Sequence, residues 1–365
     1  MQYKAYGKTG KKISVIGFGG MRFHKEDYEK SYEKAALVVR RASALGINYF
    51  DTAPFYCDDK SEEIMGEAFR DMPNPFYVST KSSISSEKTA DEVRARIEKS
   101  LKRMGLEKID FFNMWCILNL EQYKNVMAKG GPYEGALKAK EEGLIDHLVF
   151  STHCSGDEIA TIIRDGYFEG VTLGYNATNF AFRQEGIKAA YEEGVGVVTM
   201  NPLGGGIIPQ HSNFYQFIKE DESDSIAQAA LKFNIGHKEI TCALAGMGSI
   251  KEVEENVKAG ESFKLIGDER LEEMKSKLHA GLDSLCTGCG YCTGCPKDIA
   301  IPKMMDAYNM KIISNEDKRI LGRLKYHWGI EQAMASECIA CGLCEKKCTQ
   351  HIPIIERLQY IANVE

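Results

Sequence analysis

The stretch CTGCGYCTGCP, from Cys286 to Pro296, decides how this chain is organised. It places four cysteines at two-residue intervals, namely Cys286, Cys289, Cys292 and Cys295. A second stretch, CIACGLCEKKC, adds Cys338, Cys341, Cys344 and Cys348. Eight of the 12 cysteines therefore fall in two short runs near the end of a 365-residue chain. Tight runs of this kind are typical of metal or redox chemistry rather than of disulfides.

The spacing of the two runs predicts a ferredoxin-like module with two [4Fe-4S] clusters. Three thiolates spaced by two residues can bind one cubane, and the fourth cysteine of each run then reaches the other cluster, as in bacterial two-cluster ferredoxins. One predicted ligand set is Cys286, Cys289, Cys292 and Cys348, and the other is Cys338, Cys341, Cys344 and Cys295. Thr349 departs from the ferredoxin pattern, where proline usually follows the last cysteine. Two structural zinc sites are the alternative, but zinc-binding cysteine pairs are normally separated by longer loops.

Length and composition predict one large domain followed by this small module. A chain of 365 residues that is 44% apolar can bury a full core, and we predict a barrel over residues 1–280 and the module over 281–365. The net charge of −6, with Lys and Arg scattered, argues against nucleic acid as a partner. No stretch approaches the ~20 apolar residues of a membrane span, so we expect no membrane partner and a cytoplasmic location.

Short β-rich segments alternate with amphipathic segments between residues 10 and 260, which is typical of parallel strands covered by helices. The expected strands are 13–18, 48–52, 76–80, 108–114, 145–151, 170–175, 195–200 and 240–245. Capping-box pairs mark the starts of three helices: Thr89 with Glu92, Ser155 with Glu158, and Ser249 with Glu252. Eight strands in this order predict an α/β fold with a closed (β/α)₈ TIM barrel, whose chemistry lies at the C-terminal strand ends.

The motifs at these strand ends resemble the aldo-keto reductase family. They are NYFDTAPFY at 48–56, VSTK at 78–81, FSTH at 150–153, YN at 175–176, PLGGG at 202–206 and GMGSIKEVEEN at 246–256. A subgroup of the family with a C-terminal two-cluster module also carries a CTGCGYC run, so the likeness covers nearly the whole chain. The resemblance implies reduction of a carbonyl or related group in a pocket at the barrel mouth.

Carried over from the family, Tyr56 would be the general acid, Lys81 would stabilise its phenolate form, and Asp51 would pair with Lys81. A buried ammonium beside a phenol favours the ionised form. A purely structural ion pair is the alternative. The family's catalytic histidine is replaced by Trp115, which cannot transfer a proton at neutral pH, and His153 is the predicted substitute.

The resemblance also implies a nicotinamide cofactor. Its predicted contacts are Ser151, Asn176, Gly204, Gly246, Ser249 and Asn256. Gly246 and Glu252 stand where many family members have basic residues for the NADP phosphate, and Thr172 replaces an amide contact. A carboxylate at a helix start repels a phosphate. The expected nicotinamide is therefore NAD(H) rather than NADP(H).

Three more cysteines lie directly beyond the second, fourth and fifth predicted strands: Cys57, Cys116 and Cys154. Three thiolates could hold a third [4Fe-4S] cluster or another metal centre with one iron open to substrate. Free cysteines that act as small apolar residues are the alternative, and this is our interpretation of Cys242.

The sequence favours an iron-sulfur oxidoreductase that reduces a small organic substrate at the barrel mouth. Electrons would come from a one-electron donor such as ferredoxin or flavodoxin and pass through the two C-terminal clusters, with the third centre as a further hypothesis. Two alternatives stay open: an NAD(H)-dependent aldo-keto reductase with Tyr56 as the general acid, and an electron-transfer protein with a catalytically inactive barrel.

Overall fold

The computed structural model describes residues 1–277, 285–286 and 288–364. Eight parallel strands close into a barrel in the order β10-β3-β4-β5-β6-β7-β8-β9. Their bounds are β3 Ile16–Gly19, β4 Tyr49–Asp51, β5 Tyr77–Ser83, β6 Ile109–Ile117, β7 Ile145–Thr152, β8 Gly170–Gly174, β9 Gly196–Met200 and β10 Cys242–Gly246. The predicted (β/α)₈ barrel is therefore confirmed.

The predicted strand at 13–18 is wrong in one respect, because it is two strands. β2 (Lys12–Ser14) pairs antiparallel with β1 (Tyr3–Ala5), and only β3 joins the barrel. The sequence is β-rich on both sides of the break, so it does not show where β2 ends and β3 begins. β2 is buried through its pairing with β1, and β3 is buried within the barrel. After β1, the Tyr6 ring lies so close to Gly170 and Gly196 that an added Cβ at either glycine would meet it at 2.1 and 2.4 Å. Tyr6 thus fills the bottom of the barrel.

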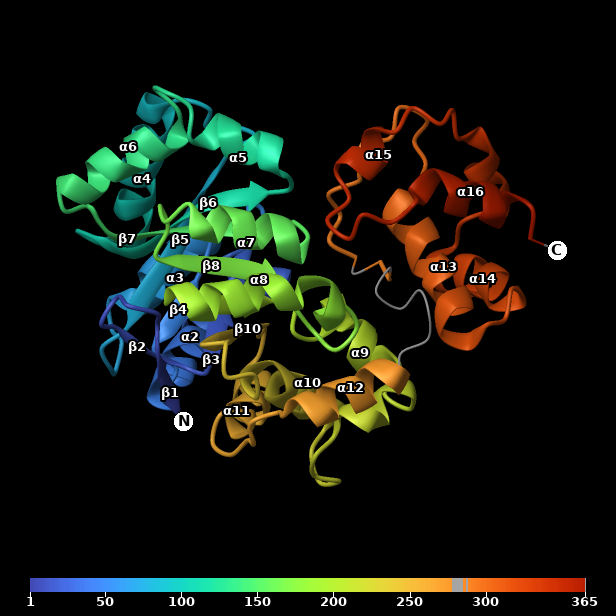
Figure 1. Ribbon diagram of the computed structural model, residues 1–365, viewed down its shortest axis with the longest axis horizontal. Helices are drawn as coiled ribbons and strands as arrows, with labels where there is room; N and C mark the ends of the chain where they lie inside the picture. Colours follow the sequence, from blue (N-terminus) through green and yellow to red (C-terminus); the bar gives the residue numbers. More distant parts are fainter. Residues whose placement is uncertain (278–284, 287, 365) are drawn as a thin grey trace.

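Helices cover the outside of the barrel, as Figure 1 shows. Their bounds are α1 Lys25–Tyr28, α2 Glu33–Ala44, α3 Ser61–Phe69, α4 Ala90–Met104, α5 Leu120–Val126, α6 Pro132–Glu141, α7 Gly156–Arg164, α8 Phe180–Glu193, α9 Ile207–Gln210, α10 Ile226–Ile235, α11 Ile250–Ala259 and α12 Asp268–Lys277. The capping boxes predicted from Thr89, Ser155 and Ser249 are all present. The main core lies between these helices and the strands, so the side chains at the barrel mouth stand on a rigid support.

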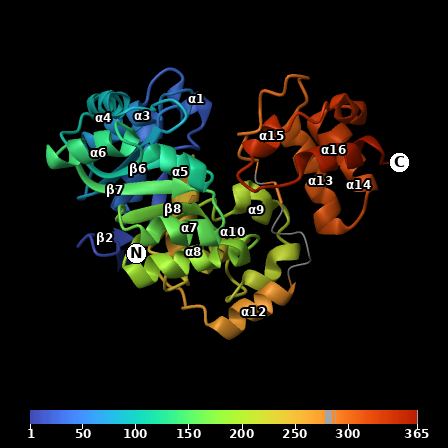
Figure 2. The same cartoon turned by 45° about the horizontal axis from the view of Figure 1, so that its top comes forward.

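The C-terminal residues form a second body with its own apolar core. Its helices are α13 Ile301–Ser314, α14 Lys318–Gly322, α15 Leu343–Lys346 and α16 Ile354–Ala362, with further helical turns at Arg323–Trp328 and Gln332–Glu337. Figures 1 and 2 both show this module beside the barrel, near α8 and α9. The predicted domain boundary between residues 280 and 281 lies outside the described residues. Among the helices of the described residues, none is long and apolar enough to cross a bilayer.

Candidate functional site

A buried ion pair stands at the C-terminal ends of β4 and β5. The Lys81 ammonium donates to Asp51 Oδ2 at 2.5 Å and to the Thr52 carbonyl at 2.8 Å. Ser79 donates to the other oxygen of Asp51 at 2.8 Å. Lys81 Nζ also lies 5.3 Å from the centroid of the Tyr56 ring. The structure therefore brings together the three residues predicted as the catalytic group.

The electrostatics of this group differ from the prediction. Burial raises the pKa of Tyr56 well above its ordinary value, and the charge of Asp51 raises it further. Burial lowers the pKa of Lys81, which the charge of Asp51 partly offsets. Burial and Asp51, the residue that holds the Lys81 ammonium, thus act on the Tyr56 phenol in the direction opposite to the one we expected from Lys81. Tyr56 is a neutral phenol at physiological pH and can serve as a proton donor.

An irregularity near the end of β6 shapes the next part of the mouth. The register with β7 shifts between Met114 and Ile117, and Cys116 has a φ of 70°. Its amide donates to the Ser151 hydroxyl at 3.0 Å, which holds the irregular turn. Trp115 stands edge-on to Tyr56, with ring centroids 5.6 Å apart. The residue that replaces the family histidine is thus packed against the predicted general acid.

The module contributes a residue to this mouth that our sequence analysis missed. Tyr291 forms side-chain hydrogen bonds with both Trp115 and Cys116. Its hydroxyl donates to the Cys116 sulfur, an interaction that opposes the effect of burial on the pKa of that thiol. The only sequence signal was an aromatic residue between Cys289 and Cys292 in the quoted run. Such a residue can equally pack within its own module, so position along the chain did not identify it.

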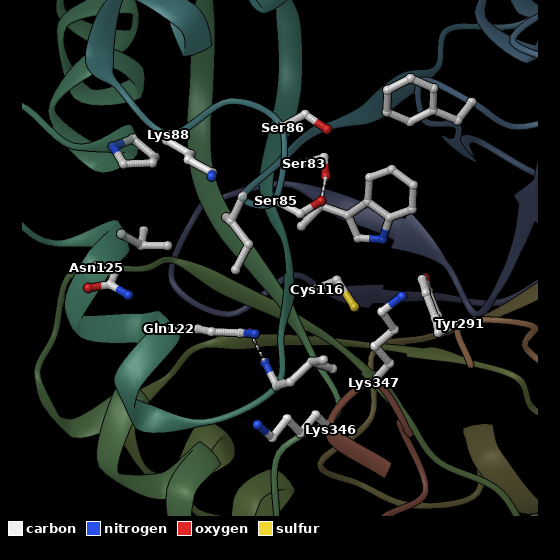
Figure 3. Close-up of a pocket in the computed structure, with 16 residues that line it drawn as sticks. Ser83, Ser85, Ser86, Lys88, Cys116, Gln122, Asn125, Tyr291, Lys346 and Lys347 are labelled. Atoms are coloured by element: carbon white, nitrogen blue, oxygen red, sulfur yellow. Dashed lines mark hydrogen bonds between the residues drawn. The ribbon is translucent and has the colours of Figure 1, made fainter. Parts of the chain in front are cut away.

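A pocket of about 780 Å³ lies where barrel and module meet (Figure 3). Its volume is within the roughly 300–1,000 Å³ of small-molecule sites. It is lined by Phe55, Ser83, Ile84, Ser85, Ser86, Lys88, Trp115, Cys116, Leu118, Gln122, Asn125, Val126, Pro132, Tyr291, Lys346 and Lys347. We call it the interdomain pocket. It is built from the loop after β4, the ends of β5 and β6, and both cysteine runs of the module.

His153 stands edge-on to Tyr291, with ring centroids 6.1 Å apart, and is not among the lining residues of the interdomain pocket. Burial lowers its pKa to about 3, and the positive charges of Arg183 and His351 add to this effect. Among the described residues its Nδ1 has no hydrogen-bond partner. His153 is neutral at physiological pH, so it can accept a proton only weakly and is a poor general acid.

A buried arginine joins the barrel to the module. Arg183 donates to the Gly174 carbonyl at 2.8 Å in the barrel and to the Thr349 carbonyl at 3.1 Å in the module. The Thr349 hydroxyl lies 3.3 Å from the Cys289 sulfur. Thr349, which stands where ferredoxins usually have proline, thus contacts both a predicted cluster ligand and the barrel anchor.

The first predicted cluster set converges in the structure. Burial raises the pKa of Cys286 to about 12, and repulsion from Cys289, Cys292 and Cys348 contributes. The charge of Cys289 also acts on Cys348, which belongs to the other run. Thiols gathered in this way ionise together only when bound metal neutralises them, so the donor set fits an iron-sulfur cluster.

The second predicted set shares the module core. Cys344 is buried there, Cys295 and Cys338 pack against the same core, and the charge of Cys338 acts on Cys344. Cys341 is exposed. Within the described ranges, no three His, Cys, Asp or Glu side chains are close enough for a single metal ion. A cubane does not require such a group, because each thiolate binds a different iron.

The three barrel cysteines have different neighbours. The Cys57 thiol lies 3.5 Å from the Gly20 carbonyl, and the buried Cys154 thiol lies 3.6 Å from the Ile117 carbonyl. Cys116 is hydrogen-bonded to Tyr291, and its pKa is raised to about 12, mainly by burial, with a contribution from Cys154. The charge of Cys154 therefore acts on Cys116, whereas Cys57 is directed towards the segment after β3.

A second, smaller pocket of about 380 Å³ lies on the other side of the mouth, along the ends of β9 and β10. We call it the glycine groove. Of the predicted nicotinamide contacts, Gly246 lines it, together with Glu252 and Arg22. Glu252 accepts hydrogen bonds from the amides of Gly248 and Ser249 at 2.7 and 3.2 Å, so its carboxylate occupies the start of α11.

The other predicted nicotinamide contacts are committed to internal interactions or lie outside the lining of the glycine groove. The Asn176 amide donates to the Asn201 carbonyl at 3.0 Å, and its oxygen accepts from the Thr178 amide at 2.9 Å. Ser151 accepts from Cys116. Gly204 lies in a short helical turn, Gly204–Gly206, and Asn256 is buried within α11.

A closed parallel barrel with an Asp-Tyr-Lys group at its mouth, joined to a module with eight gathered cysteines, defines an iron-sulfur oxidoreductase. Comparisons with known proteins agree with this class. The chain belongs to the aldo/keto reductase family, whose pattern matches residues 15–279, and a 4Fe-4S dicluster domain matches residues 285–353.

Two curated relatives illustrate the range of the family. L-galactose dehydrogenase of Arabidopsis thaliana is 28% identical over 76% of this chain and 94% of its own length. Pyridoxine 4-dehydrogenase of Escherichia coli is 23% identical over 68% of this chain and 90% of its own length. An aldo-keto reductase from Bacillus halodurans has the same fold, with a TM-score of 0.64 and 19% identity over 77% of this chain and 97% of that one. Another aldo-keto reductase, from Klebsiella pneumoniae and in complex with NADPH, has a TM-score of 0.62. It is 20% identical over 76% of this chain and 95% of its own chain.

Proposed function

We propose that this oxidoreductase reduces a small organic substrate in the interdomain pocket, taking two electrons from outside and two protons through the barrel mouth. A one-electron donor such as ferredoxin or flavodoxin is the proposed partner, and the cytoplasm is the proposed location. When bound by the eight C-terminal cysteines, the clusters supply electrons one at a time. The proposed domain limits are 1–280 and 281–365.

The contact of Tyr291 with Trp115 and Cys116 carries this proposal. Tyr291 lies between two predicted ligands of the first cluster, Cys289 and Cys292, so the same loop that would hold a cluster also lines the interdomain pocket. Electron transfer to a bound molecule would then cross a single side chain or backbone segment. A module that served only to stabilise the fold would not need to face the barrel mouth.

The barrel residues would manage binding and protons. Tyr56 is not itself among the lining residues of the interdomain pocket, but it packs against Trp115, which is, and as a neutral phenol it donates a proton to the reduced substrate. Asp51, which accepts a hydrogen bond from Ser79, holds Lys81 beside the Tyr56 ring. Trp115 and Tyr291 line the interdomain pocket and contact the bound substrate beside Tyr56. The hydrogen bond from Trp115 to Tyr291 substitutes for the positioning role of the absent histidine, without transferring a proton.

Replacing Tyr56 by phenylalanine tests this assignment. In anaerobically reconstituted protein reduced with dithionite, we expect reoxidation of the clusters by substrate to slow by about 10²- to 10⁴-fold, because a general acid contributes about that factor. Cluster reduction should be unchanged. Candidate carbonyl and unsaturated compounds are screened by the return of cluster absorbance, with Tyr326→Phe, an 84% exposed tyrosine of the module, as the matched control. Equal rates in Tyr56→Phe and wild type would favour the electron-carrier function with an inactive barrel.

A nicotinamide in the glycine groove is the second candidate, because Arg22 and His24 line that groove beside Gly246 and a family member of the same fold was solved in complex with NADPH. The Glu252 carboxylate at the start of α11 would make NAD(H) the preferred form.

The variant Glu252→Gln tests the nicotinamide candidate, because glutamine can still accept the capping hydrogen bonds but carries no charge. We expect the affinity for NADPH relative to NADH to rise about two- to fivefold, since a charge at a helix start contributes roughly 0.3–1 kcal/mol. Titration calorimetry of both nucleotides measures this ratio. Absence of binding by either nucleotide, in both proteins, would remove the hydride-transfer alternative.

A further inference from the structure

Lysines dominate the charge of the interdomain pocket. Lys88 comes from the loop after β5, and Lys346 and Lys347 come from the second cysteine run of the module. Among the described residues that line this pocket, none is an aspartate or a glutamate. The chain as a whole has a net charge of −6, so a pocket lined by three lysines and no carboxylate differs in charge from the rest of the protein.

The charge of Lys88 acts on the Glu92 carboxylate, so Lys346 and Lys347 are the lysines of this set that can bind an external group. Within the described part of the chain, no ion pair joins Lys88, Lys346 or Lys347 to a carboxylate. In Figure 3 the Lys347 side chain extends into the same space as Cys116 and Tyr291. Lys88 lies on the other side of the pocket, near Asn125, so Lys347 is the lysine that faces the space beside Cys116 and Tyr291.

The remainder of the lining is apolar or neutral. Phe55, Ile84, Trp115, Leu118 and Val126 provide the apolar part, and the Phe55 and Trp115 rings are stacked with centroids 6.5 Å apart. Gln122 and the serines of residues 83–86 offer neutral hydrogen bonds. A ligand that matches this lining has a flat or apolar body and one negatively charged end.

We propose that the interdomain pocket binds an organic anion, such as a carboxylate with an aromatic or unsaturated body. Lys347 holds the anionic group beside Cys116 and Tyr291, and Trp115 and Phe55 contact the body. This inference rests on the proposed function in naming the bound molecule as the substrate. It implies that the substrate site is complete only when the module is docked, because Tyr291 and both module lysines belong to it.

Calorimetric titration of the reconstituted, oxidised holoprotein tests the proposal without turnover. The probes are matched pairs of acid and amide: benzoate with benzamide, cinnamate with cinnamamide, and 4-hydroxyphenylacetate with its amide. We expect at least one acid to bind about tenfold more tightly than its amide, which is the factor for one charge-assisted contact. Lys347→Gln should lower the affinity for that acid by a similar factor and leave the affinity for its amide unchanged.

The control variant is Lys325→Gln. Lys325 is an exposed residue of the module and is not among the lining residues of the interdomain pocket, so its replacement should leave acid binding unchanged. The proposal is overturned if no acid binds more tightly than its amide. It is also overturned if Lys347→Gln slows reduction by ferredoxin but does not alter acid binding, since the lysines would then dock an acidic donor protein. Both results leave the electron relay itself intact, so they are distinguishable from failure of the proposed function.

Discussion

Replacing Cys292 by alanine is expected to lower the iron content from about eight to about four atoms per chain, because each [4Fe-4S] cluster needs four thiolates. Cys292 is buried in the module core, where the charges of Cys289 and Cys348 act on it. Iron and sulfide analysis after anaerobic reconstitution measures the loss, and EPR of the reduced protein should show one cluster signal instead of two interacting ones.

Variants of other cysteines separate the possible ligand sets. Cys341→Ala should also remove about four irons, because it belongs to the second predicted set. Cys242→Ala, which removes a fully buried thiol inside the barrel, should leave the iron content unchanged. Cys116→Ala tests the hypothesis of a third centre. A wild-type value near twelve irons that falls to eight in Cys116→Ala would support that centre, and a value near eight in both proteins would eliminate it. Zinc in place of iron would contradict the cluster assignment itself.

Breaking the buried ion pair at the barrel mouth is expected to destabilise the protein by about 3 to 5 kcal/mol, because one charge is then left buried without a partner. Asp51→Asn removes the negative charge beside the Lys81 ammonium and leaves it only neutral acceptors among its present partners, the amide oxygen and the Thr52 carbonyl. Lys81→Met leaves the Asp51 carboxylate, among the described residues, with the Ser79 hydroxyl as its one side-chain donor. Urea unfolding followed by circular dichroism under anaerobic conditions measures both changes.

The double variant Asp51→Leu/Lys81→Met is the control for this prediction. Because both charges are removed together, it should be less destabilised than either single variant. If the double variant folds well but no longer reoxidises with substrate, the pair serves catalysis as well as structure. If the single variants lose less than about 1 kcal/mol, the pair is solvated and the buried geometry described above is wrong.

Much of the fold was predictable because its signals are local. Eight strand segments, the capping boxes and the cysteine runs each depend on residues within a few positions of one another. The exception was the strand expected at 13–18. The backbone leaves the β1–β2 hairpin and enters the barrel between Ser14 and Ile16. This change of partner depends on contacts with Gln2 and with β10, which lie far away in the sequence.

The candidate site was predictable only in part. Asp51, Tyr56 and Lys81 could be placed from motifs at neighbouring strand ends, because consecutive barrel strands pair with each other. The direction of the Tyr56 pKa shift could not, since it depends first on the burial of the phenol and on the charge of Asp51, with further contributions from Tyr291 and Cys116. His153 is near the mouth, but Arg183 and burial keep it neutral.

By itself, the sequence determined that a reductase-type barrel precedes a module with eight clustered thiols, because residue periodicity and cysteine spacing are properties of the chain. Only the tertiary structure decided where the module docks. Arg183 holds the loop after Cys348, and this contact brings Tyr291 and Lys347 to the barrel mouth. No sequence pattern encodes that juxtaposition, because it results from the summed packing and hydrogen bonding of two separately folded cores.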